Sequence, residues 1–290
     1  MYRRIHSPPF YASIIEKKGE GTVSDWDSRQ YLKFKAERTQ PATDLARRME
    51  LESPRKIADI GCGPGNSTAV LQSMFPEAEI TGFDSSEDML RAARESCPGA
   101  RFEFCDASRD LPALGTDFDA VFSNACLQWV PAHKKRIPEL LGMLKPGGTL
   151  AVQVPMNFEE PIHRIISAAA ASEKWRRFFP HPRVFYTLAP EEYSDLLADC
   201  SSGFQMWTTT YFHMLPSQEA ILEWYRSTGL RPYLDALPAE RKAGFEADIM
   251  EQVRAAYPPR KDGRVIFRFP RLFFTAQAPA SVSRGPTGAK

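Results

Sequence analysis

Short apolar runs alternate with stretches of helical spacing over residues 56–154. The runs that we predict to be strands are residues 57–60, 79–84, 101–105, 117–124 and 149–154. The stretches between them, including residues 67–74, 86–96 and 133–144, are predicted to be helices. This alternation predicts an α/β fold with a doubly wound, mostly parallel sheet.

The pattern changes after Pro155. Helical stretches at 161–179, 190–200 and 217–257, the last broken at Gly229 and Pro232, surround two further strands at 204–213 and 264–276. We therefore predict a seven-stranded, Rossmann-like sheet whose inserts at 155–203 and 214–262 form a helical cap over the site. Pro270 cannot donate to a strand ladder, so the last strand is predicted to be an edge strand or to carry a bulge.

Four regions follow from this reading. They are a flexible extension at 1–22, a ligand-binding core at 23–154, the remaining strands with the cap at 155–278, and a flexible tail at 279–290. Residues 41–49 are predicted to form a separate helix before the first strand. Ahead of it, Tyr31, Phe34 and Arg38 share one helical face, which either packs against the core or covers the ligand.

A glycine-rich loop follows the first predicted strand. Gly61, Gly63 and Gly65 stand at alternate positions, and a helix begins directly after them. Glycine lets the backbone turn sharply and approach a ligand closely, and a helix N-terminus directs free N–H groups at that ligand. The spacing G-x-G-x-G differs from the dinucleotide fingerprint G-x-G-x-x-G, which disfavours an NAD-linked oxidoreductase.

Acidic residues end the first three predicted strands. Asp59 lies before the first glycine, where it suits a ligand that carries an ammonium group. Asp84 ends the second strand, where a carboxylate can bind both ribose hydroxyls. Asp106 follows the third strand and either caps its loop or accepts from an adenine amino group, while the N–H of Ala107 binds a ring nitrogen.

The end of the fourth strand is predicted to border both ligands. In a parallel sheet, ligands bind outside the carboxyl ends of the strands near the point where strand order reverses. Asn124, Gln128 and Trp129 lie in this segment. For Trp129, packing in the core is the alternative.

These residues resemble a known family. Asp59 to Gly65 followed by Asp84 resembles the first motif and the ribose-binding acid of class I methyltransferases that depend on S-adenosylmethionine (SAM). Over residues 23–276 the chain is similar to trans-aconitate methyltransferases. The motifs that carry this similarity include Tyr31-Leu32, Asn66-Ser67-Thr68, Asp84-Ser85-Ser86, Leu127-Gln128-Trp129, Thr208-Thr209-Thr210-Tyr211, Thr228-Gly229-Leu230-Arg231-Pro232 and Phe269-Pro270-Arg271-Leu272.

The resemblance implies methyl transfer from SAM to one carboxylate of trans-aconitate. The residues expected to bind SAM are Tyr31, Arg38, Asp59, Gly61, Gly63, Gly65, Asp84, Ser85, Met89, Asp106, Ala107 and Asn124. Those expected to position the acid are Gln128, Trp129, Tyr211, His213, Arg231 and Arg271. For Arg231 a helix-terminal charge is the alternative reading, and for His213 a core histidine.

No general base is expected. A carboxylic acid with a pKa near ~4 is already ionised at neutral pH, so the protein can act by orienting the reactants. Arginine suits a polycarboxylate because its guanidinium binds carboxylates with two hydrogen bonds. We also expect no metal, because the five histidines show no ligand spacing.

Composition narrows the partners. Lys and Arg number 37 against 36 Asp and Glu, so no basic footprint for nucleic acid is present. The five cysteines include no C-x-x-C pair and are expected to be buried thiols in a reducing compartment. No apolar run is long enough to span a bilayer, so a cytoplasmic protein is expected, with monomer or oligomer left open.

Two alternatives stay open. The first is an O-methyltransferase that acts on another small acid or on a secondary metabolite. Met156 and the aromatic residues between Trp175 and Tyr186 would favour a larger apolar acceptor of this kind. A SAM-binding module without catalytic activity, whose cap docks a partner, is the second.

Overall fold

The computed structural model describes residues 35–180, 184–226 and 228–280. It contains a seven-stranded sheet in the order β3-β2-β1-β4-β5-β7-β6. The strands are β1 (Lys56–Ile60), β2 (Glu79–Asp84), β3 (Arg101–Phe104), β4 (Phe118–Asn124), β5 (Leu144–Pro155), β6 (Gly203–Leu215) and β7 (Val265–Gln277). Neighbours among β1–β5 pair in parallel, whereas β7 is antiparallel to both β5 and β6. The predicted fold class is confirmed.

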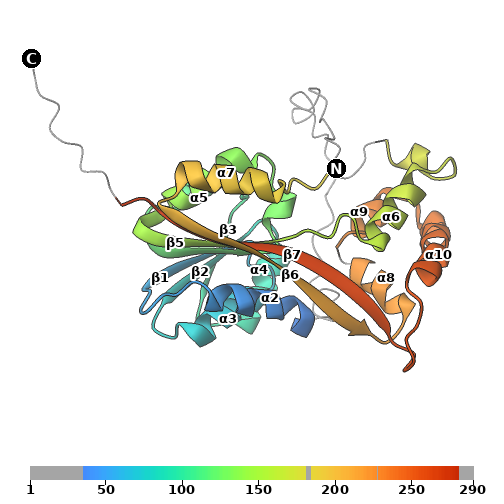
Figure 1. The fold of residues 1–290 in the computed structure, drawn as a ribbon, viewed down its shortest axis with the longest axis horizontal. Helices are drawn as coiled ribbons and strands as arrows, with labels where there is room; N and C mark the ends of the chain where they lie inside the picture. Colours follow the sequence, from blue (N-terminus) through green and yellow to red (C-terminus); the bar gives the residue numbers. More distant parts are fainter. Residues whose placement is uncertain (1–34, 181–183, 227, 281–290) are drawn as a thin grey trace, which may run out of the picture.

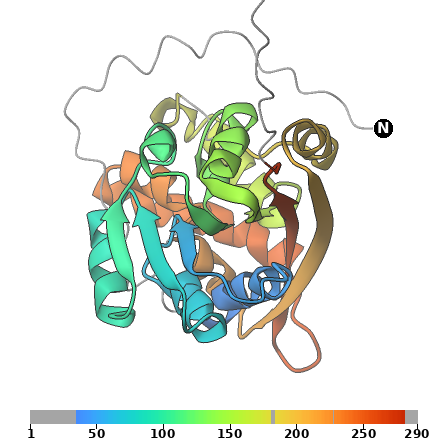
Figure 2. The ribbon, with the colours of Figure 1, turned by 90° about the vertical axis from the view of Figure 1, so that its left-hand side faces the viewer.

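Helices cover both faces of this sheet (Figure 1). On one face lie α2 (Lys35–Arg47), α3 (Asn66–Met74) and α4 (Glu87–Ser96), and on the other lie α5 (His133–Gly142) and α7 (Pro190–Cys200). The chain winds one way from β1 to β3 and the other way from β4 onward, which Figure 2 shows along the strands. The order therefore reverses between β1 and β4, where α/β proteins bind ligands.

Local signals explain why these elements form. β1 is buried at four of its five positions, as a central parallel strand requires. The hydroxyl of Ser86 accepts from the N–H of Met89 and caps α4. In α2, Ala42, Leu45 and Ala46 pack against the sheet, so the helix continues through Pro41 instead of beginning there as predicted. This packing offsets the backbone hydrogen bond that an internal proline removes.

The cap is a second cluster at one end of the sheet (Figure 1). Its helices are α6 (Pro161–Ala171), α8 (Gln218–Arg226), α9 (Arg231–Ala236) and α10 (Ala239–Ala256), and the short 3-10 helix η4 (Arg176–Phe178) packs with them. Two other 3-10 helices, η2 (Leu111–Ala113) and η3 (Leu127–Trp129), lie elsewhere in the chain. β6 and β7 continue past the end of β5, and Phe267 and Phe269 on this extension pack into the apolar core of the cap.

Three details differ from the sequence predictions. The helix expected over 161–179 ends at Ala171, and η4 follows separately. Helix α7 lies in the predicted cap segment, yet Tyr193 and Leu197 pack it into the core beside α5. β7 is an interior strand, and Pro270 is tolerated there because it lies one residue beyond the β5 ladder, where its carbonyl accepts from the N–H of Met156. The division into regions stays a prediction.

Candidate active site

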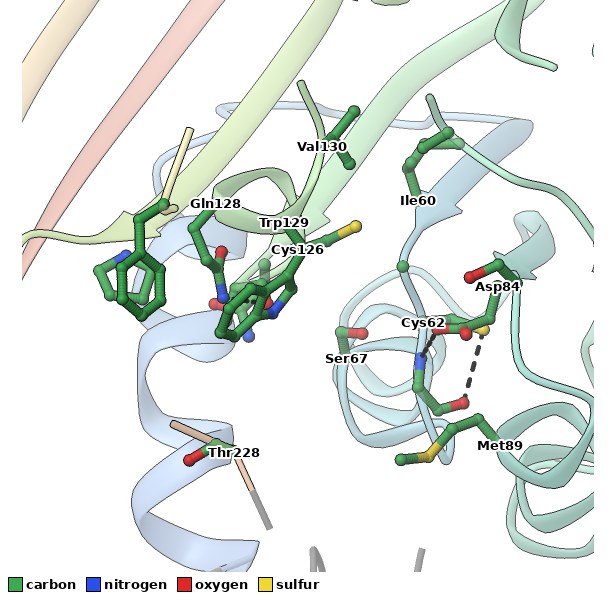
Figure 3. Close-up of a pocket in the computed structure, with 18 of the residues that line it drawn as sticks. Ile60, Cys62, Ser67, Asp84, Met89, Cys126, Gln128, Trp129, Val130 and Thr228 are labelled. Atoms are coloured by element: carbon green, nitrogen blue, oxygen red, sulfur yellow. Dashed lines mark hydrogen bonds between the residues drawn. The ribbon is translucent and has the colours of Figure 1, made fainter. Parts of the chain in front are cut away.

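A cavity of about 390 Å³ lies where the parallel strands end. The last residues of four strands line it: Ile60, Asp84, Asn124 and Pro155. Figure 3 shows that Asp84, Cys62 and Met89 lie on one side of this space, and Gln128, Trp129 and Thr228 on the other. The first side comes from the sheet and its loops, and the second is completed by the cap.

The glycine loop forms the floor at the end of β1. Gly61 has φ +74°, and a Cβ there would lie 2.3 Å from the Cβ and the Sγ of Cys126. Gly63 has φ +54° but no atom of the described residues lies within 4 Å of its Cβ position, so this side of the loop is open. Gly61 therefore joins the β1 and β4 loops closely, while Gly63 leaves room for a ligand.

Asp84 is fixed at the edge of the cavity by backbone donors. The N–H of Gly63 donates to its Oδ2 at 3.0 Å and the N–H of Ser86 to its Oδ1 at 2.9 Å. These bonds tie the glycine loop to the end of β2. They also orient the carboxylate, and Ser85 and Met89 line the cavity beside it.

Asp106 both caps its loop and lines the cavity. Its Oδ1 accepts from the N–H of Ser108 at 2.9 Å and from the hydroxyl of Ser108 at 2.6 Å. Ala107 and Asn124 also line the cavity, and the buried Oδ1 of Asn124 has no hydrogen-bond partner within the described part of the chain. Asp106 therefore caps its loop, and its contact with adenine stays a prediction.

The opposite wall contains Gln128, Trp129 and Arg271. Nε2 of Gln128 donates to the carbonyl of Ala125 at 2.7 Å, so this amide presents its oxygen, and not its nitrogen, to other groups. Trp129 packs against Phe185 with ring centroids 5.1 Å apart. The guanidinium of Arg271 donates to Oε1 of Gln153 at 3.1 Å and lies 4.1 Å from the centre of the Phe269 ring. It is a cation held in a largely buried position.

Two residues predicted to bind the cofactor lie behind the wall. The carboxylate of Asp59 is fully buried, and its Oδ2 accepts from the hydroxyls of Ser67 and Thr68 at 2.7 Å each. It therefore holds the start of α3 and does not line the cavity. Gly65, at φ +91°, is the residue before α3, and a Cβ there would lie 2.9 Å from Oγ of Ser96. Gly65 is thus required for packing against the end of α4.

Three residues predicted to position the acid also lie outside the lining. The hydroxyl of Tyr211 donates to Asp44 on α2 at 2.6 Å. His213 lies on the same face of β6, among the rings of Tyr211, Trp224 and Phe267, and its burial, with a smaller effect of Arg271, lowers its pKa to about 4.

Arg231 begins α9, and its Nε lies 3.4 Å from Oδ2 of Asp235. Its neighbours Thr228 and Gly229 line the cavity instead. Two further predictions concern the N-terminal helix. Tyr31 lies outside the described residues, and Arg38 belongs to α2 but its side chain lies outside what the structure describes.

Several residues of the cavity wall could not be predicted from the sequence. Asn157, His163 and Tyr225 come from the loop after β5, from α6 and from α8, and all three line the cavity with Phe185. His163 is bonded to the hydroxyl of Tyr225, 62 residues away in the chain. Because no local pattern links such distant positions, only the packing of the cap reveals this group.

Comparison with known proteins identifies the family. A family model described as "Methyltransferase domain" matches residues 57–148. The trans-aconitate 2-methyltransferase of Rhodopseudomonas palustris (strain BisB18) is 45% identical over 256 residues, which are 88% of this chain and 99% of that protein. The chain belongs to the trans-aconitate 2-methyltransferase family. The family enzyme of Methylobacterium radiotolerans is 44% identical over 259 residues, with 88% and 99% covered.

Solved structures agree with the family's fold. The YcgJ protein from Bacillus subtilis superimposes with a TM-score of 0.55 at 15% identity and covers 83% of this chain and 99% of its own. A structure from Bacillus halodurans C-125, described as that of a methyltransferase, superimposes with a TM-score of 0.51 at 17% identity. It covers 83% of this chain and 100% of its own. At such identities the likeness concerns the fold alone.

The described residues of this family member contain neither a helix that could cross a membrane nor a group of side chains that could hold a metal ion. No helix there is long and apolar enough to cross a membrane. Within the same residues, no group of three or more His, Cys, Asp and Glu side chains is arranged to hold a metal ion. Cys62, Cys105 and Cys126 line the cavity, but burial raises the pKa of each thiol.

We predict a pH-dependent effect of Asp59→Asn on stability. Burial raises the pKa of Asp59 from 3.8 to about 6, so the folded state binds a proton more tightly than the unfolded chain. The wild type then loses stability as pH rises from 4 through 6, whereas the variant has no such charge to bury. Relative to wild type, the free energy of unfolding of Asp59→Asn should increase by up to about 3 kcal/mol between pH 4 and pH 7.

Urea unfolding of both proteins at each pH measures this difference. The other carboxyl groups are the same in both proteins, so their effects cancel in the difference. Glu77→Gln, in the exposed turn before β2, serves as the control and should show a flat difference. A difference that is also flat for Asp59→Asn would show that Asp59 titrates normally.

Proposed function

We propose that the chain transfers the methyl group of SAM to one carboxylate of trans-aconitate, giving the monomethyl ester and S-adenosylhomocysteine. The observation that carries the proposal is a single cavity with two different ends. One end has oriented acidic and backbone groups at Asp84 and Asp106, and the other has the buried cation Arg271. The relatives named for this reaction, similar over almost their whole length, support the choice of acid.

The first end suits the nucleoside part of SAM. The carboxylate of Asp84 would accept from the ribose hydroxyls, and Asp106 with the N–H of Ala107 would bind the adenine edge. The open side of Gly63 leaves room for the ligand, and the unpartnered Oδ1 of Asn124, within the described residues, can accept from an ammonium group. Gln128 likewise presents its amide oxygen, which can accept from an N–H or O–H group of a ligand but cannot bond to a carboxylate oxygen.

SAM supplies a methyl group on a positively charged sulfur. The acceptor carboxylate is already ionised, so one of its oxygens forms the new O–CH3 bond while the electrons of the broken S–CH3 bond stay on sulfur. No proton is transferred, and no general base is needed. The protein's part is to hold the oxygen in line with the methyl group in a water-poor space, an effect worth several kcal/mol, on the order of 5.

A second candidate acceptor is favoured by the aromatic wall. Like Arg271, five aromatic residues line the cavity, namely Trp129, Phe185, Tyr186, Trp224 and Phe269. Such a wall also suits one carboxylate attached to an apolar body. Of the residues on which this alternative was based, Phe185 and Tyr186 line the cavity, whereas Met156, Trp175, Phe178 and Phe179 do not.

Mass spectrometry tests the proposed reaction directly. Purified protein is incubated with SAM and one acid at a time, and methyl esters are quantified. The acids are trans-aconitate, cis-aconitate, citrate, isocitrate, an aromatic monocarboxylate and a long-chain monocarboxylate. We expect trans-aconitate to be methylated in clear preference. Methylation of an aromatic or long-chain monocarboxylate instead would favour the second candidate.

We predict that Asp84→Ala weakens SAM binding. The variant loses the carboxylate that would accept from the ribose hydroxyls, and charged hydrogen bonds contribute about 1.5–3 kcal/mol, so Kd should rise about 10-fold to 100-fold. Calorimetry measures Kd, and Asp88→Ala, in the first turn of α4 but outside the cavity lining, is the control. Wild-type affinity in Asp84→Ala would remove the ribose assignment.

We predict that Arg271→Met raises the KM for the acid by about 10-fold to 100-fold, because a buried charge-assisted contact is lost. SAM affinity should change little. Arg268→Met is the matched control, because Arg268 lies three residues away on the same strand and is exposed. An unchanged KM in Arg271→Met, with the protein folded, would exclude Arg271 from acid binding.

A further inference from the structure

A hydrogen-bonded chain of three side chains lines the cap side of the cavity. Nδ2 of Asn157 donates to the hydroxyl of Tyr225 at 3.1 Å, and this hydroxyl lies 2.9 Å from Nε2 of His163. Asn157 is 3% exposed and Tyr225 is 2% exposed. A polar chain that is buried this deeply and reaches a cavity wall has a defined orientation.

Aromatic contacts fix the imidazole ring further. His163 lies edge-on to Phe158, Phe185 and Tyr225, with ring centroids 6.2, 5.4 and 5.2 Å apart. The hydrogen bond to Tyr225 and these three neighbouring rings therefore help to hold the imidazole. Little rotation is available to it.

The hydrogen bond to Tyr225 bears on where the imidazole carries its proton. Burial raises the pKa of Tyr225 well above its ordinary value, so its side chain stays a phenol. Asn157 donates to the phenol oxygen. When the phenol hydrogen is directed at Nε2 of His163, a neutral imidazole carries its proton on Nδ1, and a charged ring carries a proton there as well. In these two states Nδ1 is a donor.

The charges of the wall make this donor important. Among the described residues that line the cavity, Arg271 and His163 are the side chains that can carry a positive charge. They come from β7 and α6. A polycarboxylate bound near Arg271 alone would leave its other carboxylates beside aromatic rings, which is unfavourable for a charged group.

We propose that His163 binds a second, non-reacting carboxylate of the acceptor through Nδ1–H, and that this contact selects acids with more than one carboxylate. Tyr225 and Asn157 act through His163 and are positioning residues. The inference rests on the proposed function and extends it. A donor on a non-reacting carboxylate leaves the nucleophilic oxygen of the reacting one unbound and reactive.

The test compares acids that carry different numbers of carboxylates. The probes are trans-aconitate with three, trans-glutaconate with two and crotonate with one, and kcat and KM for ester formation are measured for each. His163→Leu removes the donor. His163→Asn restores an N–H near the position of Nδ1, and Tyr225→Phe removes the group that fixes the proton.

We expect His163→Leu to raise KM for trans-aconitate and trans-glutaconate about 10-fold to 100-fold, the value of one charged hydrogen bond, with little change for crotonate. kcat and the Kd for SAM should stay close to wild type. His163→Asn should recover most of the loss, and Tyr225→Phe should show a smaller rise in KM. Met156→Leu, beside Asn157 but outside the lining, is the control.

An equal change for all three acids, or an unchanged KM for trans-aconitate, would overturn the inference. Calorimetric titration of trans-aconitate into the protein with S-adenosylhomocysteine separates this from the proposed function. Binding that weakens in His163→Leu, but without ester formation in the wild type, would support the carboxylate contact and overturn the proposed reaction. Equal affinity in wild type and His163→Leu would overturn the contact.

Discussion

The site depends on the close approach of two loops at the point where the sheet reverses its winding. A side chain at Gly61 would overlap Cys126, so the β1 loop and the β4 loop can meet only because residue 61 is glycine. This contact brings the ends of β1 and β4 to one place. The ends of β2 and β5 pair beside them, and four strand ends therefore line one cavity.

The side of this cavity that we propose for the nucleoside could be predicted from the sequence because its signals are local. A strand, a glycine turn and a helix follow one another within 20 residues, and an acid ends the next strand. The acid Asp59 shows the limit of such reasoning. Its position in the motif was clear, but burial behind the wall and two hydroxyl donors from α3 make it a structural support in this fold.

The side of the cavity that we propose for the acceptor could be predicted only in part. Strand β6 was recognised, yet alternation along a strand does not tell which face meets a ligand, and Tyr211 and His213 face α2 and the cap core instead. Arg271 was found because it belongs to a family motif. His163, Tyr225 and Asn157 meet only when the cap helices pack, so a contact that spans 62 or 68 residues left no mark in the sequence.

A crystal structure of the complex with S-adenosylhomocysteine and trans-aconitate would test the central claim that one cavity holds both ligands. We predict the ribose at Asp84, the adenine at Asp106, and two carboxylates of the acid at Arg271 and His163, with the third directed at the sulfur. An acid bound outside this cavity, or a nucleoside at the cap end with the acid at Asp84, would contradict it.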